Sequence, residues 1–309
     1  MKTGMQTAVA IQGERGSFSE QAAEKLFGSR INLICCPSFD DLFAAMKRRE
    51  ARFAVVPIEN TLAGSIHKNY DLLLESGLEI VAETNIRIEH CLIGTGDAKL
   101  DRIETVLSHP VALDQCRQFF KEHRRMKEQE TYDTAGAVQN VIRDGDRRIA
   151  AIASLAAARH FGGKVLAKNI EDNPENFTRF FALHKSTGAL SWSGGPRRKK
   201  RGQGYRRAVR RKTVRNGSES VKTSLVFITK NIPGALFRCL SVFALRDINL
   251  SKIESRPLPG RPWEYLFYVD LSAALNEERT RNALRHLEEI TEFLKVLGCY
   301  STVGEREKR

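Results

Sequence analysis

Two neighbouring residues in the middle of the chain, Thr178 and Arg179, have polar side chains that could contact an anionic ligand. The Thr178 hydroxyl can donate or accept a hydrogen bond, and the Arg179 guanidinium forms a fork that matches a carboxylate. They follow a turn-like stretch, 171–175, and precede an apolar run, 180–183, that is typical of a short buried strand. The pattern predicts a site at a loop-to-strand junction. A plain edge strand with one solvated arginine is the alternative.

Other polar residues stand where predicted strands end. Glu59 and Asn60 follow a buried-looking strand over 52–56, at the edge where ligands of open α/β sheets gather. Ser108 and His109 follow another strand, 103–107, and precede a helix predicted to begin near Pro110. These positions suit substrate contacts, although a lone histidine is more often structural.

Two further candidates lie at predicted helix starts. Ser17 ends a Gly-rich turn before a helix over 20–27, and such a turn presents N–H groups to an anion. Thr134 opens a helix that continues through 142. Both hydroxyls are also ordinary helix caps, and that alternative stays open.

The predicted elements divide the chain in two. Strands and helices alternate from 8 to 183, which indicates an α/β sheet domain. The expected elements include a helix capped by Ser38 and strands over 78–83, 86–93 and 164–167, the last returning toward the opening motif. From 221 to 303 the order is strand, helix, strand, strand, helix, strand, which is the ferredoxin-like pattern, and Asn276 is expected to cap the second of these helices. Between them, residues 196–215 hold eleven Lys or Arg and no acidic residue. This stretch therefore carries +11 of the chain's net charge of +13. We expect this part, within 187–220, to be an extended linker that binds polyanions weakly. A nucleic-acid-binding function is the alternative, although the segment has one aromatic residue for stacking.

Composition points to a soluble globular protein without a metal site. Hydrophobic residues make up 41% and charged residues 28% of the 309 positions, and no apolar run is long enough to span a bilayer. The six cysteines form no Cys-x-x-Cys pair, and no Cys, His, Asp or Glu cluster has metal-ligand spacing. The first residues lack the features of a signal peptide. We therefore expect a cytoplasmic protein with reduced cysteines, no cofactor and no membrane partner.

Several of these segments together resemble the motifs of prephenate dehydratases. The matching segments are Thr178-Arg179-Phe180, Pro57 to Gly64, Ser108 to Cys116, Asp133-Thr134-Ala135 and, in the C-terminal part, Glu254-Ser255-Arg256-Pro257. The turn 13–19 resembles the family's first motif, but Glu14 stands in place of its usual proline and Ser17 in place of its usual threonine. The resemblance covers roughly 7–186 and 221–303.

The resemblance implies a fold and a domain plan. It implies a catalytic domain over 1–186 with two α/β lobes, like a periplasmic binding protein. Lobe one would take about 7–84 and 165–186, and lobe two about 85–164. The linker 187–220 would lead to an amino-acid-sensing ACT domain over 221–303 and a charged tail over 304–309. Pairing of ACT domains would give a homodimer or homotetramer.

The resemblance also implies roles for individual residues. Thr178 and Arg179 would be catalytic. The implied substrate-binding residues are Ser17, Glu59, Asn60, Thr61, Gly64, Ser108, His109, Gln115, Thr134, Ala135, Asn176, Phe177 and Phe180. The implied phenylalanine-binding residues are Gly234, Ala235, Leu236, Asn249, Leu250, Glu254 and Ser255.

The implied reaction turns prephenate into phenylpyruvate, with feedback by L-phenylalanine. Loss of CO2 and hydroxide makes the ring aromatic, so the reaction needs no cofactor. Arg179 and backbone N–H groups would hold the two carboxylates, and Thr178 would assist the leaving hydroxide with a hydrogen bond. Two alternatives remain: an arogenate dehydratase, and a non-catalytic two-lobed amino-acid sensor.

Overall fold

The computed structural model describes residues 6–185, 221–258 and 260–303. The chain divides into two compact units. The first holds the residues up to Leu72 together with Thr84–Ala182, and the second holds Leu73–Glu83 together with the residues from Leu183 onward. The predicted linker and charged tail lie outside the described residues, and the predicted domain limits stay predictions. Within the described ranges, no helix is long and apolar enough to cross a bilayer.

The first unit is built from two α/β lobes, as predicted. The first lobe contains β1 (Thr7–Gln12), α1 (Phe18–Phe27), β2 (Ile31–Cys36), α2 (Phe39–Arg48), β3 (Phe53–Asn60), β4 (Gly64–Ser65) and β11 (Phe177–Lys185). The sheet order is β11-β3-β1-β2, with β1 parallel to both neighbours. Val9, Ala10 and Ile11 of β1 are all fully buried, as expected for a parallel strand covered on both faces. Ser17 caps α1 and Ser38 caps α2, which confirms both predicted helix starts.

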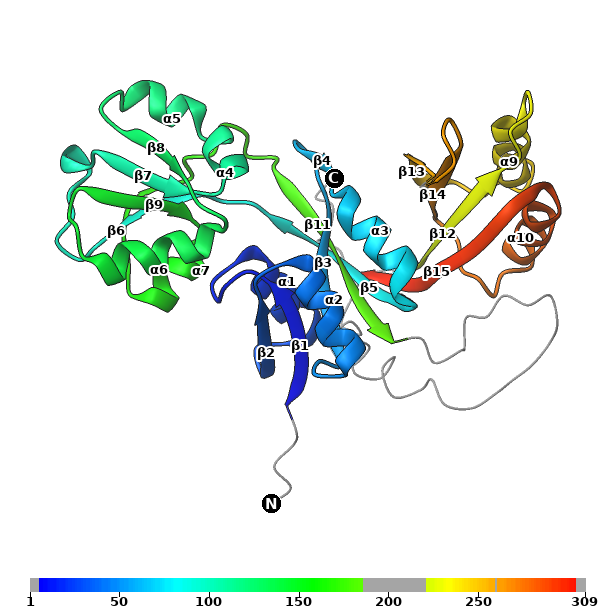
Figure 1. The fold of residues 1–309 in the computed structure, drawn as a ribbon, viewed down its shortest axis with the longest axis horizontal. Helices are drawn as coiled ribbons and strands as arrows, with labels where there is room; N and C mark the ends of the chain where they lie inside the picture. Colours follow the sequence, from blue (N-terminus) through cyan, green and yellow to red (C-terminus); the bar gives the residue numbers. More distant parts are fainter. Residues whose placement is uncertain (1–5, 186–220, 259, 304–309) are drawn as a thin grey trace, which may run out of the picture. The chain divides into compact units, whose positions relative to one another are not determined.

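The second lobe is a five-stranded sheet with helices on both faces (Figure 1). Its elements are β6 (Cys91–Gly94), η1 (Leu100–Arg102), β7 (Thr105–Ser108), α4 (Pro110–Asp114), α5 (Arg117–Glu122), β8 (Lys127–Glu130), α6 (Thr134–Asp144), β9 (Ile149–Ala153), α7 (Leu155–Phe161) and β10 (Lys164–Lys168). The order is β10-β6-β9-β7-β8. Neighbouring residues of β6 point to opposite faces of the sheet. Leu92 belongs to the same core cluster as Phe119 of α5, whereas Ile93 belongs to the cluster that contains Val138 of α6.

Three local expectations are corrected. The strands expected over 78–83 and 86–93 are replaced by one long strand, β5 (Leu78–Arg87), followed by β6 from Cys91. The strand expected to return toward the opening motif, 164–167, instead pairs antiparallel with β6. The cap of α6 is Asp133 rather than Thr134, because the Asp133 carboxylate accepts a hydrogen bond from the N–H of Gly136.

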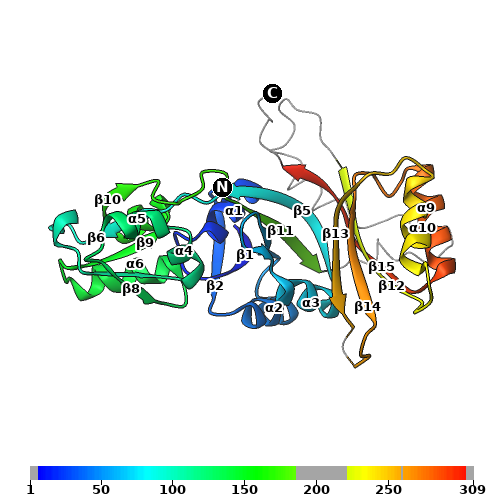
Figure 2. The ribbon, with the colours of Figure 1, turned by 90° about the horizontal axis from the view of Figure 1, so that it is seen from above.

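The second unit has the predicted ferredoxin-like order. It contains β12 (Val221–Thr229), α9 (Ala235–Ala244), β13 (Leu250–Pro257), β14 (Tyr265–Leu271), α10 (Glu278–Ile290) and β15 (Thr291–Val303). The sheet order is β13-β14-β12-β15, and α9 and α10 lie side by side on one face (Figures 1 and 2). Phe227 and Phe243 lie in the core beneath the helices. Asn276 was expected to cap α10, but the capping position is occupied by Glu277 without a side-chain bond.

The second unit also includes part of the N-terminal half. The helix α3 (His67–Ser76) ends in it, and the first residues of β5 lie beside β15. A Cβ on Gly298 of β15 would lie 2.4 Å from the carbonyl oxygen of Ile80 in β5. Only glycine therefore allows the two strands to approach so closely.

Candidate active site

Three polar side chains that the sequence singled out meet on adjacent strands of the first lobe. The amide nitrogen of Asn60, at the end of β3, lies 2.7 Å from Asn176 Oδ1 and 3.0 Å from Thr178 Oγ1 of β11. All three side chains are buried, and Asn176 is fully so. Buried polar groups of this kind are stable only when they hydrogen-bond to each other or to a ligand.

The orientation of the Asn60 amide is fixed by the backbone. Its oxygen accepts hydrogen bonds from the N–H groups of Leu62 (3.0 Å) and Ala63 (2.9 Å), so its nitrogen must face Thr178. An amide nitrogen only donates, so Thr178 Oγ1 is the acceptor in this pair. The hydroxyl hydrogen of Thr178 is consequently left to point at another acceptor. The Asn176 amide nitrogen likewise has no hydrogen-bond partner within the described residues.

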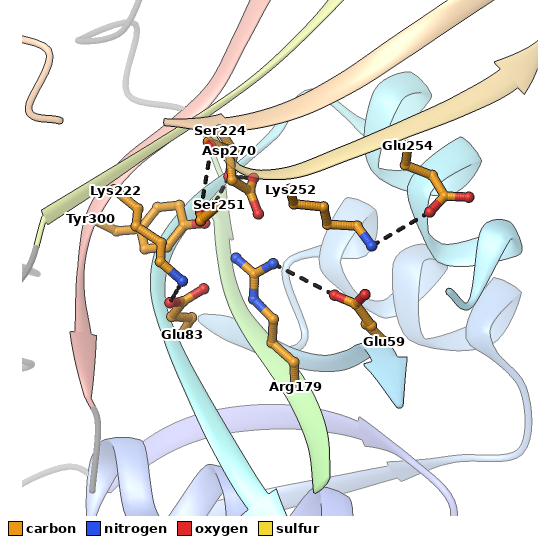
Figure 3. Close-up of polar contacts among 10 residues, drawn as sticks. All are labelled: Glu59, Glu83, Arg179, Lys222, Ser224, Ser251, Lys252, Glu254, Asp270 and Tyr300. Atoms are coloured by element: carbon orange, nitrogen blue, oxygen red, sulfur yellow. Dashed lines mark hydrogen bonds and ion pairs between the residues drawn. The ribbon is translucent and has the colours of Figure 1, made fainter. Parts of the chain in front are cut away.

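Arg179 and Glu59 lie on the other face of the same two strands. Successive residues of a strand point to opposite faces, so Asn60 and Thr178 share one face while their neighbours share the other. The Arg179 guanidinium lies 3.9 Å from Glu59 Oε2 (Figure 3) and 4.8 Å from the ring centre of Phe181, two residues along. The structure thus does not bring Thr178 and Arg179 together, because β11 begins at Phe177 rather than at Phe180 as expected.

The loop after β3 is tied to the start of β11 by backbone and hydroxyl contacts. The N–H of Thr61 donates to Phe177 O (2.9 Å), and the N–H of Phe177 donates to the Thr61 hydroxyl (3.0 Å). Gly64 has a φ of +81°, a left-handed conformation that favours glycine. Phe180 is 2% exposed and belongs to the core. These predicted site residues shape the loop and strand around Asn60 and Thr178.

Ser17 is placed at the start of α1. Its buried hydroxyl accepts from the N–H of Glu20 (3.3 Å), while the Glu20 carboxylate accepts from the N–H of Gly16. This arrangement is similar to a capping box, except that Glu20 accepts from the N–H of Gly16, the residue before the cap. The Ser17 oxygen therefore stabilises the helix.

The predicted residues of the second lobe are mostly engaged in structural bonds. The fully buried Ser108 donates its hydroxyl to Ile152 O (2.6 Å). His109 caps α4 by accepting from the N–H of Val111 (3.2 Å). Burial lowers the pKa of His109, against the opposing effect of the Asp133 and Glu130 carboxylates, so the ring is neutral at pH 7.

Gln115 and His90 form a pair that the sequence alone does not indicate. Gln115 Oε1 lies 3.0 Å from His90 Nε2, and burial lowers the pKa of His90. The neutral ring therefore carries its proton on Nε2, facing the amide oxygen. Phe18 of α1 packs edge-on against the same ring, with 5.8 Å between ring centres. Thr134 and the buried Ala135 form the first turn of α6, directly after Asp133.

In the second unit, the predicted phenylalanine-binding residues lie at the start of α9 and at or along β13. Gly234, with a φ of +75°, precedes α9, whose residues Ala235 and Leu236 follow. Leu236 and Leu250 pack against the core beneath the helices. Beyond a register shift after Leu250, Glu254 pairs with Lys252 at 3.4 Å (Figure 3). Asn249 precedes β13 and the exposed Ser255 lies within it.

Metal-ligating and nucleophilic groups are scarce in the described part of the chain. There, no three His, Cys, Asp or Glu side chains gather in a way that could hold a metal ion. All six cysteines are free thiols, and burial raises the pKa of Cys35 to about 11. That thiol is therefore protonated at neutral pH and is a poor nucleophile.

The described residues form a two-lobed α/β domain, with a buried threonine hydroxyl oriented by an asparagine, followed by a unit with the ferredoxin-like order. A family model described as "Prephenate dehydratase" matches residues 9–187. The chain belongs to the prephenate dehydratase family, and it is a dehydratase.

Individual relatives agree with this family. The chain is 40% identical over 309 residues to a protein of Arabidopsis thaliana named arogenate dehydratase/prephenate dehydratase 2, chloroplastic, covering 97% of this chain and 74% of that protein. A crystal structure of prephenate dehydratase in complex with L-Phe from Arthrobacter aurescens has a TM-score of 0.79 and 27% identity, covering 98% of this chain and 92% of that one. A solved structure described as GqqA, a quorum-quenching acylase, has a TM-score of 0.80 and 29% identity, covering 98% and 100%.

Proposed function

We propose that the protein converts prephenate to phenylpyruvate, CO2 and water, with Thr178 as the hydrogen-bond donor to the departing hydroxyl. In this reaction the bond from the ring to its carboxylate breaks, and the electron pair enters the ring. The carbon–oxygen bond on the opposite side of the ring breaks at the same time, and the departing hydroxide takes up one proton, replaced in the end from solvent, to leave as water. Negative charge develops on that oxygen, so a donor placed there lowers the barrier.

The hydrogen bond from Asn60 to Thr178 is the observation that supports this role. Because Asn60 occupies the Thr178 oxygen as a donor, the threonine hydrogen is directed away from Asn60. Asn60 then positions Thr178, and it also makes the hydroxyl a better donor, because a hydroxyl that accepts a bond donates more strongly. Arg179 and Glu59, on the other face of the strands, serve to hold β3 and β11 in register.

The same geometry counts against acyl transfer by Thr178. A threonine nucleophile needs a neighbouring base that takes its proton. The side chains bonded to this residue are amides, Asn60 directly and Asn176 through it, and amides are not bases at neutral pH. The likeness to GqqA therefore supports the shared fold rather than an acylase mechanism.

Arogenate is the second candidate substrate. Arogenate carries an amino group where prephenate carries a keto group, and the ring chemistry is the same. The Arabidopsis relative is named for both activities, which favours testing both substrates. Thr178 would act on the ring hydroxyl in either case.

We further propose that L-phenylalanine binds the second unit and lowers activity, and that this unit is an ACT domain that pairs two or more copies of the chain. The complex of the Arthrobacter aurescens enzyme with L-Phe supports the effector. The candidate residues lie on two elements, α9 and β13, and in the proposed pair they would contribute to sites shared between two copies. We keep the cytoplasm as the proposed compartment, and weak polyanion binding as the proposed property of the basic linker.

A side-by-side assay tests the proposal. Purified full-length protein is incubated with prephenate or with arogenate, and phenylpyruvate and phenylalanine are quantified. We expect phenylpyruvate from prephenate at a higher kcat/KM than phenylalanine from arogenate. The reverse ratio would make the protein an arogenate dehydratase. Absence of both products would instead favour a sensor, and binding of phenylalanine alone would then be its activity.

A further inference from the structure

The two lobes of the first unit touch through a tight turn that fits against two helix starts. The turn 13–16 lies in the first lobe, and its glycines Gly13 and Gly16 have left-handed φ angles of +93° and +83°. A Cβ on Gly16 would lie 2.5 Å from the Cα of Ala157 in α7. Backbone atoms cannot move aside as a flexible side chain can, so only glycine allows this approach.

Three hydrogen bonds hold the turn against the second lobe. The Ser154 hydroxyl, at the start of α7, donates to Gly16 O at 2.6 Å. The N–H of Glu14 donates to Asp133 Oδ2 at 3.3 Å, and the Tyr132 hydroxyl donates to Glu14 Oε1 at 3.1 Å. The turn is thus bonded to the starts of both α6 and α7.

The Asp133 carboxylate accepts two backbone hydrogen bonds at once. The same carboxylate oxygen that receives the Glu14 N–H also caps α6 through the N–H of Gly136, at 3.0 Å. A shift of the turn therefore acts directly on the first turn of α6, where Thr134 stands. At the C-terminal end of the turn, the next residue is Ser17, which caps α1.

Glu14 supplies both the N–H and the carboxylate of this contact. The motif that the turn resembles usually has proline at this position, and proline has no N–H to donate. It also has no carboxylate for Tyr132. Tyr132 is 57% exposed, and its partial burial together with the Glu14 and Asp133 carboxylates raises the pKa of the phenol to about 12, so it keeps its proton over the working pH range.

We propose that Glu14, Tyr132 and Asp133 form an interlobe clasp that holds the lobes together before substrate arrives, with Glu14 and Asp133 as positioning residues for the dehydration. The inference rests on the proposed function. Substrate binds in the closed arrangement. The apparent Kd therefore equals the Kd of the closed form divided by the fraction of molecules that are closed. Loss of the clasp therefore raises KM, whereas kcat changes little because saturating substrate itself closes the lobes.

Two matched pairs of variants in the full-length protein separate the clasp from simple structural support. Glu14→Ala removes the carboxylate that Tyr132 binds, whereas Glu14→Gln keeps an oxygen that accepts the phenol. Asp133→Ser keeps a good helix cap but is too short to reach the Glu14 N–H as well, whereas Asp133→Asn keeps an oxygen for both bonds. The readouts are kcat and KM for prephenate, and amide hydrogen exchange over residues 13–17.

We expect Glu14→Ala and Asp133→Ser to raise KM about fivefold to tenfold, to leave kcat within about twofold, and to speed exchange over 13–17. Glu14→Gln and Asp133→Asn should stay within about twofold of the unaltered protein in each measurement. Unchanged KM in both Glu14→Ala and Asp133→Ser, or a loss confined to kcat, would overturn the clasp. An inactive unaltered protein would refute the proposed function instead, and unchanged exchange in both variants would then still overturn the clasp.

Discussion

Replacing Thr178 with valine removes the proposed donor and little else. Valine keeps the branched shape of threonine and exchanges the hydroxyl for a methyl group. The Asn60 amide nitrogen loses one acceptor but keeps Asn176 Oδ1 at 2.7 Å and Phe177 O at 3.2 Å. Loss of one net hydrogen bond costs about 1 kcal/mol of stability, so the variant should fold.

The effect on turnover should be much larger. A donor aimed at charge that develops in the transition state typically contributes a factor of about 10²–10³ to kcat, or roughly 3–4 kcal/mol. The hydroxyl of bound substrate carries little charge in the ground state, so the same bond contributes little to KM. We therefore expect Thr178→Val to lower kcat by about 10²-fold or more, with a KM change below about threefold.

The measurement is steady-state formation of phenylpyruvate, with Thr178→Ser as the matched control. Serine keeps the hydroxyl and loses a methyl group, so its kcat should remain within about tenfold of the unaltered protein. A valine variant with kcat within about threefold of the original would refute the donor role. A loss in the serine variant as large as that in the valine variant would show that the methyl packing matters as much as the hydroxyl.

Three other outcomes are expected. Arg179→Lys should lower kcat by no more than about tenfold, because the guanidinium faces Glu59 on the opposite side of the strand from Thr178; a loss as large as that of Thr178→Val would put Arg179 in contact with substrate. L-Phenylalanine should lower the activity of the full chain and give a calorimetric binding signal that Glu254→Gln weakens, and no signal with the unaltered chain would contradict the effector proposal. Deleting 196–215 should leave kcat within about twofold and abolish retention on heparin, because this stretch carries eleven basic residues and we assign it no substrate contact; loss of activity would place the segment within the folded site.

The local signals in the sequence were sufficient for most elements. Ser17 and Ser38 cap the helices that were expected after them, because the capping bond joins residues only three positions apart. The strand–helix alternation of the first unit and the ferredoxin-like order of the second were also predictable. Both depend on periodicities within single elements.

The failures concern interactions between distant residues. The start of β11 was expected at Phe180, but pairing with β3 extends the strand back to Phe177, and this extension sends Thr178 and Arg179 to opposite faces. The pairing of β10 with β6 depends on a register between segments about 70 positions apart, which no local pattern encodes. Asp133 was identified only as part of a motif, because its contact with Glu14 spans 119 positions.

The pairing of β15 beside β5 has a consequence for synthesis of the chain. Lys295 Nζ donates to Leu74 O across a separation of 221 positions, so this edge of the sheet is completed only by the last strand. At a translation rate of about 5–20 residues per second, roughly 10–40 s pass before β15 follows β5 out of the ribosome. During that time the β5 edge is unpaired, and unpaired edges associate with those of other chains. We therefore expect nascent chains that lack β15 to be prone to association through this edge.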